Sequence, residues 1–121
     1  MSEAAIQSAI MQYLRTALAV PSHFGVTDMG GSTKQERYRR GRAGAAFGWP
    51  DVSGVVDGRG FYFEVKALGK YPNRRQREAL EALRNAGAVA EVVRSVEDVA
   101  VVLLREGVEL RAVPAGMRRA S

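Results

Sequence analysis

The hydrophobic and polar positions of this chain divide it into segments of helical spacing and segments of strict alternation. Residues 2–19 place apolar side chains such as Ile6 and Ile10 four positions apart, which is typical of one face of a helix. Ser2 is a candidate N-cap, and Pro21 lies just beyond the expected end. The pattern predicts a first helix over residues 2–19.

Two alternating runs follow later in the chain, over residues 51–56 and 59–67, and they flank the dipeptide Asp57-Gly58. Asp-Gly between alternating runs is the strongest short-range signal for a two-residue type I′ hairpin turn. With these two residues as the turn, the register sets Asp51 directly opposite Glu64. A turn one residue longer would exchange the two faces of the hairpin.

The hairpin has a charged face and an apolar face, because side chains alternate along a strand and opposed residues share a face. Asp51, Glu64 and Lys66 fall on the first of these faces. The second carries only apolar side chains and predicts a surface that packs on the core: Val52, Val56, Phe61, Phe63 and Val65.

The remaining pattern predicts alternating strands and helices. Residues 24–29 alternate and precede Gly30 and Gly31, which indicates a strand with His23 just before it. The later segments are a helix capped by Asn73 and running to about residue 86, a strand at 88–94, a helix capped by Ser95 over 96–106 and a last strand at 108–113. We expect a mixed α/β fold in one domain over residues 1–113, with a flexible tail at 114–121.

The charged face of the hairpin contains two carboxylates that should repel one another, unless a cation lies between them. Mg²⁺ binds through one or two carboxylates together with water and phosphate oxygens. A lysine at position 66 would lie at the edge of such a site, where it could orient or deprotonate a water. The outline is that of phosphodiester hydrolysis by Asp51, Glu64 and Lys66. The alternative is a solvated charged face, which is common on antiparallel sheets.

Charge and composition narrow the choice of partner. The net charge is +5, carried by 15 arginines and 3 lysines, and such a basic surface favours polyanions such as nucleic acid. Cysteine is absent, so thiolate metal sites are excluded, and a reducing, cytoplasmic location is expected. The single histidine, His23, is expected to be a surface residue. No segment has the length and apolarity of a membrane span, and the Ser2-Glu3 start is not that of a signal peptide.

Basic residues gather in two places beside the predicted site. Residues 32–47 lack periodicity and carry five cations that could grip phosphates: Lys34, Arg37, Arg39, Arg40 and Arg42. A solvated loop explains this run equally well. Arg74 and Arg75 open the helix after Asn73, where cations oppose the helix dipole, so phosphate contact is the better explanation. Lys70 lies in the polar connection before them.

These motifs resemble the PD-(D/E)XK nuclease superfamily, and most closely its virus-type replication-repair nuclease branch, the VRR-NUC domain. The matching residues follow the family's order over residues 1 to about 105: Glu3 with Gln7, Gly48-x-Pro50-Asp51, Glu64-x-Lys66 and Gln76. The resemblance implies a restriction-endonuclease-like core and a metal-dependent nuclease. Stand-alone members are similar to Holliday-junction resolvases, which act as homodimers on branched DNA.

The resemblance also implies a role for each matching residue. Asp51, Glu64 and the main-chain carbonyl of Val65 would hold Mg²⁺ or Mn²⁺. Glu3 would join the site or orient its water, although in an isolated reading it is only an acid that interacts with the helix dipole. Lys66 would position the attacking water and offset charge at phosphorus, and Gln76 would orient Lys66 or the phosphate.

Two other functions remain open at this point. The chain could be a nucleic-acid-binding module with an inactive or partner-dependent site. It could also hydrolyse another phosphate ester, such as RNA or a nucleotide. Because aromatic residues are few, no base-stacking platform is evident in the sequence, which favours recognition of backbone and shape.

Overall fold

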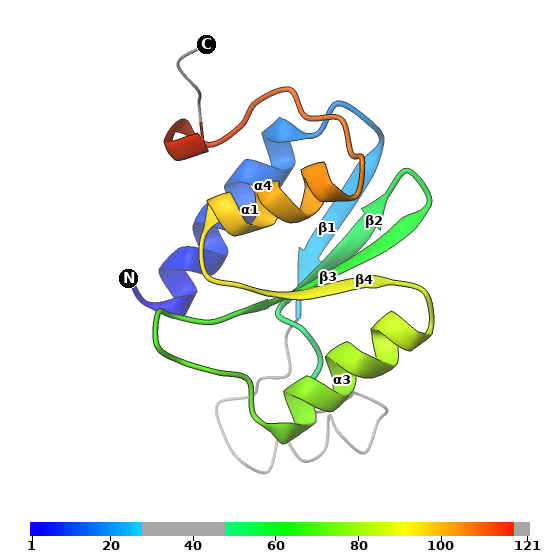
Figure 1. The fold of residues 1–121 in the computed structure, drawn as a ribbon. Coiled ribbons are helices and arrows are strands. Elements are labelled where there is room, and N and C mark those ends of the chain that lie inside the picture. The colour runs from blue at the N-terminus through cyan, green and yellow to red at the C-terminus, as the bar shows by residue number, and fades with distance from the viewer. Residues whose placement is uncertain (28–47, 118–121) are drawn as a thin grey trace.

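The computed structural model describes residues 1–27 and 48–117, and its centre is one four-stranded sheet (Figure 1). The strands lie in the order β1-β2-β3-β4; β1 to β3 are antiparallel, whereas β4 runs parallel to β3. The elements in chain order are α1 (Glu3–Ala17), β1 (Ser22–Val26), β2 (Val52–Val56), β3 (Arg59–Val65), α3 (Arg74–Asn85), β4 (Val89–Val93), α4 (Val96–Arg105) and the 3₁₀ turn η1 (Ala115–Met117). This confirms the predicted mixed α/β fold.

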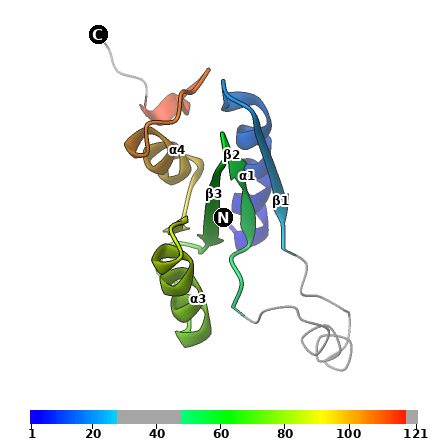
Figure 2. The same ribbon diagram turned by 90° about the vertical axis from the view of Figure 1, so that its right-hand side faces the viewer.

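The helices cover both faces of the sheet. Figure 1 shows α1 and α4 together on one side and α3 on the other, and the perpendicular view in Figure 2 separates α3 from α4. The core between the sheet and the α1–α4 pair includes the apolar side of the hairpin, as predicted; Phe61 and Phe63 are completely buried there, against Ile10 and Leu103. The charged side of the hairpin therefore belongs to the α3 face of the sheet.

The predicted hairpin register is confirmed. Val52 pairs with Phe63, and Val56 pairs with Arg59, so only two residues form the turn. Asp57 and Gly58 have φ angles of +48° and +82°, and a type I′ turn needs positive φ at both positions. β2 begins at Val52, so Asp51 comes immediately before the strand.

The predicted helix caps are also present. The Ser2 hydroxyl accepts from the Ala5 N–H at 3.1 Å, and Asn73 and Gln76 form a reciprocal capping box at the start of α3. Ser95 caps α4 by accepting from the Asp98 N–H at 3.0 Å. Local sequence chemistry alone fixes these starts.

Two strand predictions need correction. The first strand covers Ser22–Val26, two residues earlier than the start predicted for 24–29, because its register with β2 begins at Ser22. His23 therefore lies inside the strand, where it is exposed, and residues 28–29 are outside the described part. The predicted strand at 108–113 is a single antiparallel bridge between Leu110 and Leu18, because there the chain meets the end of a helix and not a sheet edge.

The C-terminal tail contains one short element. The tail predicted for 114–121 begins with the 3₁₀ turn η1, and residues 118–121 lie outside the described range. Among the helices described, none is both long and apolar enough to cross a membrane.

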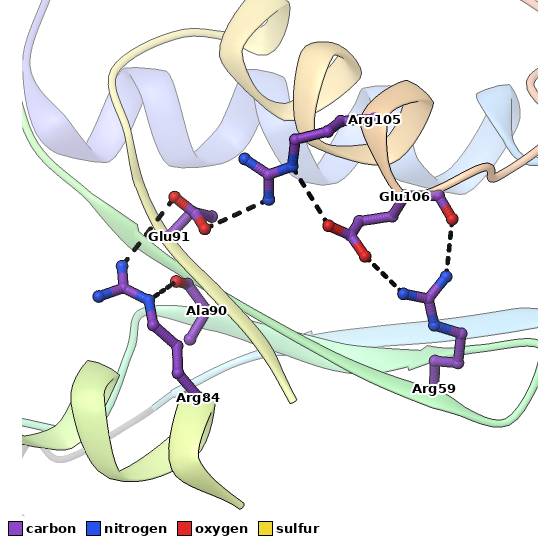
Figure 3. Close-up of polar contacts among 6 residues, drawn as sticks. All are labelled: Arg59, Arg84, Ala90, Glu91, Arg105 and Glu106. Carbon is purple, nitrogen blue, oxygen red and sulfur yellow. Dashed lines mark hydrogen bonds and ion pairs between the residues drawn. The ribbon is translucent and has the colours of Figure 1, made fainter. Parts of the chain in front are cut away.

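A chain of ion pairs links four elements and runs from the hairpin-turn end of β3 to the middle of β4 (Figure 3). Arg84 of α3 lies 4.0 Å from Glu91 of β4, and Glu91 lies 3.3 Å from Arg105 of α4. Arg105 also contacts Glu106 at 3.2 Å, and Glu106 accepts from Arg59 of β3 at 2.6 Å. Glu91 pairs with Phe63, so its side chain belongs to the face of the sheet opposite that of Glu64.

Candidate active site

Asp51 and Glu64 face one another at the open end of the hairpin, as the register predicts. Asp51 Oδ2 accepts a hydrogen bond of 2.8 Å from the Val65 N–H, which fixes the aspartate against β3. Glu64 lies on the adjoining position of the same strand and is only 1% exposed. The hairpin therefore holds a buried carboxyl group against a second, partly buried one.

The environment of Glu64 opposes its ionisation. Burial, and then the negative charge of Asp51, raise the pKa of Glu64 to about 8, although the Lys66 ammonium acts in the opposite direction. At neutral pH and without a cation, Glu64 is thus a protonated acid beside an aspartate. Its Oε1 atom is buried and has no hydrogen-bond partner among residues 1–27 and 48–117. A buried oxygen of this kind is costly unless something else binds it.

The donor set fits a hard divalent cation. The Glu64 carboxyl, whose ionisation is suppressed in the bare protein, would ionise beside such an ion, and its buried Oε1, which has no hydrogen-bond partner among the described residues, offers the ion a ligand. Within residues 1–27 and 48–117, no three histidine, aspartate or glutamate side chains gather into a metal site. A cation at Asp51 and Glu64 would therefore need main-chain or water oxygens as well.

The Val65 carbonyl is placed to be one of those oxygens. The Lys66 N–H donates to β4 at 3.0 Å, so the backbone groups of Val65, one residue earlier, point toward β2. Extending the β2–β3 register by two more pairs sets Asp51 opposite Glu64 and Pro50 opposite Val65. Proline has no N–H to donate to the Val65 carbonyl. The Pro50 carbonyl accepts from Thr27 Oγ1 at 2.6 Å, while Asp51 takes the Val65 N–H.

Lys66 completes the predicted charged face. Its Nζ lies 3.6 Å from Glu64 Oε2, and its side chain is 13% exposed. Lys66 therefore places its ammonium group beside the carboxylate pair, where it is partly exposed to solvent. This position allows it to contact a bound anion and the carboxylates at once.

Glu3 reaches the same end of β3 from the first turn of α1. Its Oε2 accepts from the Ala67 N–H at 3.2 Å, just after Lys66 in the chain. The contact ties the start of α1 to the end of β3, so the helix dipole alone does not account for this residue. Gln7, one turn further along α1, is partly buried.

Gly48 packs against the first turn of α3, and this contact links the Gly-x-Pro-Asp segment to Gln76. The φ angle of Gly48 is +79°, and a Cβ there would lie 2.6 Å from the Arg75 carbonyl carbon and 2.9 Å from the Gln76 nitrogen. Only glycine allows this approach. The Gln76 side chain itself accepts from the Asn73 N–H at 2.9 Å through Oε1, so it is first of all a cap.

The predicted nucleic-acid-binding residues fall into two groups. Lys70 and Arg74 are exposed, Arg74 forms an ion pair of 3.4 Å with Glu78, and Arg75 lies beside the Gly48 contact. The other five lie outside the described residues: Lys34, Arg37, Arg39, Arg40 and Arg42.

One aromatic pair was missed by the sequence reasoning. The rings of Trp49 and Tyr62 meet edge to face with centroids 5.6 Å apart, and Trp49 is 36% exposed. Tyr62 shares the strand face of Glu64, two residues away, so aromatic surface does lie beside the carboxylates. Only the tertiary path of the segment before β2 brings these rings together, and no local pattern reveals it.

Comparison with known proteins supports the same fold. No protein-family model matches the sequence, and no curated protein matches it either. A solved structure, described as a VRR_NUC domain protein, superimposes with a TM-score of 0.62 over 87% of both chains, at 21% sequence identity. The chain has the fold of a VRR_NUC domain.

The VRR_NUC fold confirms the resemblance drawn from the motifs. In this fold the motif residues come from separate elements that meet at one end of the sheet: Glu3 from α1, Asp51 from the entry to β2, Glu64 and Lys66 from β3, and Gln76 from α3. At 21% identity the likeness establishes the fold, so the chemistry has to be argued from these side chains.

Proposed function

We propose that the protein is a metal-dependent nuclease that hydrolyses phosphodiester bonds in DNA. The observation that carries the proposal is the arrangement of Asp51 and Glu64 as facing carboxyl groups, with Lys66 Nζ 3.6 Å from Glu64. The VRR_NUC fold and the basic composition support the same activity. A solvated hairpin face is disfavoured, because Glu64 is 1% exposed.

Asp51, Glu64 and the Val65 carbonyl would hold Mg²⁺, with Mn²⁺ as a substitute. When bound, the ion supplies a positive charge that stabilises the charge developing on the phosphoryl oxygens. The protein itself keeps the two carboxylates side by side. The hydrogen bond from the Val65 N–H holds Asp51 in its position beside Glu64.

Lys66 holds the reacting groups in this proposal. Its ammonium donates hydrogen bonds to a phosphate oxygen and to the attacking water, and it offsets the charge at phosphorus. The water oxygen forms a bond to phosphorus as one backbone P–O bond breaks; the water's proton passes to solvent, and the departing sugar oxygen takes up a proton from solvent. Glu3 orients the end of β3 and its water, and Gln76 positions the phosphate or Lys66 from the start of α3.

The proposed substrate is branched DNA, such as a Holliday junction, cut by a homodimer in the cytoplasm. A chain with one site must pair through a two-fold axis to cut two strands at symmetric positions. Sedimentation should therefore give the mass of two chains with junction DNA bound. A complex containing one chain per junction would refute this part of the proposal.

The test is cleavage of a matched DNA panel in Mg²⁺ and in Mn²⁺: four-way junction, flap, splayed arms, duplex and single strand. We expect cutting that requires metal, and a loss of several orders of magnitude in Lys66→Ala, equivalent to a few kcal/mol of transition-state stabilisation. Asp51→Asn should abolish cutting while DNA binding persists. Glu109→Gln, which changes an exposed acid after α4, serves as the control. Tight binding without cutting in any metal would support a binding module instead.

A further inference from the structure

The connection between β3 and α3 is held more firmly than its loop composition predicts. The Lys70 N–H donates to the Ala67 carbonyl at 3.0 Å, and Gly69 between them has a φ angle of +81°, so residues 67–70 form a closed β-turn. Figure 1 shows the connection running from the end of β3, past the start of α1, to the start of α3.

Three contacts from other elements hold this turn. Glu3 Oε2 accepts from the Ala67 N–H at 3.2 Å, on the α1 side. On the β4 side, Arg94 Nη2 donates to the Lys70 carbonyl at 2.6 Å. The same guanidinium lies 5.1 Å from the centre of the Tyr71 ring. The turn is therefore fixed at both ends.

This fixed turn presents apolar surface to solvent. Leu68 is 91% exposed and Tyr71 is 76% exposed; among the large hydrophobic residues that the structure describes, Leu68 is the most exposed, and only Met1, at 86%, lies between the two. A single exposed leucine is ordinary. Leu68 differs because its turn is held by hydrogen bonds and begins one residue after Lys66. An apolar side chain held in water beside a reactive group is suited to contact a ligand.

We propose that Leu68 packs against an open nucleobase face at a DNA branch point or strand end, and so selects such DNA over continuous duplex. In a continuous duplex each base face is covered by its neighbour, whereas a branch or end leaves a face open. Lys70 ends the turn and Arg74 and Arg75 follow it, and these cations suit a polyanion and not an apolar protein partner.

This inference rests on the proposed nuclease function and names the feature of DNA that the site recognises. Contacts to phosphate bind every DNA equally and weaken with salt, whereas contact with a base face distinguishes DNA structures and is insensitive to salt. Burying an apolar side chain the size of leucine against such a face changes affinity by roughly tenfold or more.

The experiment compares the affinity of the full chain for a forked DNA and for a continuous duplex of the same length. Binding is measured by fluorescence anisotropy in EDTA, so that no cutting occurs. We expect about tenfold tighter binding to the fork, and loss of most of this preference in Leu68→Ala, with unchanged duplex affinity. A 2-aminopurine at the branch should change its fluorescence with the wild type and much less with Leu68→Ala.

Leu104→Ala is the matched control, because Leu104 is an exposed leucine of α4, which packs on the other face of the sheet. It should keep the wild-type preference. A fork preference that survives in Leu68→Ala, or is absent from the wild type, would overturn the inference while leaving metal-dependent cutting intact. A wild type that binds and cuts no DNA would refute the proposed function as well.

Discussion

At the scale of single residues, Glu64 dominates the electrostatics of the site. The usual glutamate pKa is 4.5, and burial together with the Asp51 charge raises that of Glu64 to about 8. For stability alone, an apolar residue of similar volume at this buried position would serve as well or better. Its retention beside Asp51 is explained if a cation, and not a proton, occupies the pair in the working protein.

The raised pKa predicts how stability depends on pH in the absence of metal. Between about pH 4.5 and pH 8 the unfolded chain has lost this proton and the folded chain still binds it. The stabilisation from Glu64 is therefore complete below pH 4.5 and is lost as the pH rises through about 8, by on the order of a few kcal/mol. Chemical denaturation in EDTA at a series of pH values measures this change in the free energy of unfolding.

Glu64→Gln should remove this component, because an amide does not titrate in this range. The variant should gain stability relative to wild type at pH 9, whereas Glu109→Gln should follow the wild-type profile. Adding Mg²⁺ should restore wild-type stability at high pH and have little effect on Glu64→Gln. Identical pH profiles for wild type and Glu64→Gln would contradict the buried-acid description.

The facing of Asp51 and Glu64 could be predicted from the sequence, because a two-residue Asp57-Gly58 turn leaves one register. The burial of Glu64 could not. It depends on β2 and β4, which flank β3 on either side and come from distant parts of the chain. Arg94 likewise gives no local signal of its contacts with Lys70 and Tyr71.

At the scale of elements, the Gly-x-Pro-Asp segment joins β2 to α3. Gly48 permits the close approach to α3, Pro50 has no N–H to offer the Val65 carbonyl, and Asp51 binds the Val65 N–H. The motif was recognisable in the sequence, but these reasons for it are tertiary. Helix starts were predictable because caps are local, whereas the error at 108–113 arose because its partner is the end of α1.

Gly48→Ala should disturb both stability and the site. The substitution adds left-handed backbone strain, on the order of 1–3 kcal/mol, and a Cβ within 3 Å of three backbone atoms of α3. We expect α3 to shift away from Asp51, with loss of unfolding free energy and of DNA cleavage. Urea denaturation and the cleavage rate measure the two effects.

Gly58→Ala separates strain from crowding. Gly58 has a similar φ angle of +82°, but a Cβ there meets nothing within 4 Å. The Gly58→Ala variant should lose only the unfolding free energy that corresponds to the backbone strain, and it should keep the wild-type cleavage rate. Equal effects of Gly48→Ala and Gly58→Ala would show that the contact with α3 has no part in the site.

At the scale of the whole molecule, the basic residues fall into two groups. Arg59, Arg84 and Arg105 are paired with Glu91 and Glu106 in one network (Figure 3), so their charge is largely offset there. Hydrogen bonding to Arg59 lowers the pKa of Glu106, which keeps this network charged at neutral pH. The net charge of +5 must then attract DNA mainly through other cations.

The last prediction concerns those other cations. Replacing Arg37, Arg39, Arg40 and Arg42 by alanine should weaken binding to every DNA structure and reduce the salt slope of log K by about 0.9 per lost phosphate contact. Arg105→Ala, within the ion-pair chain, should leave that slope unchanged. Anisotropy titrations between 50 and about 200 mM salt measure both. An unchanged slope in the fourfold variant would mean that residues 32–47 do not bind phosphate, and that the start of α3 carries the attraction alone.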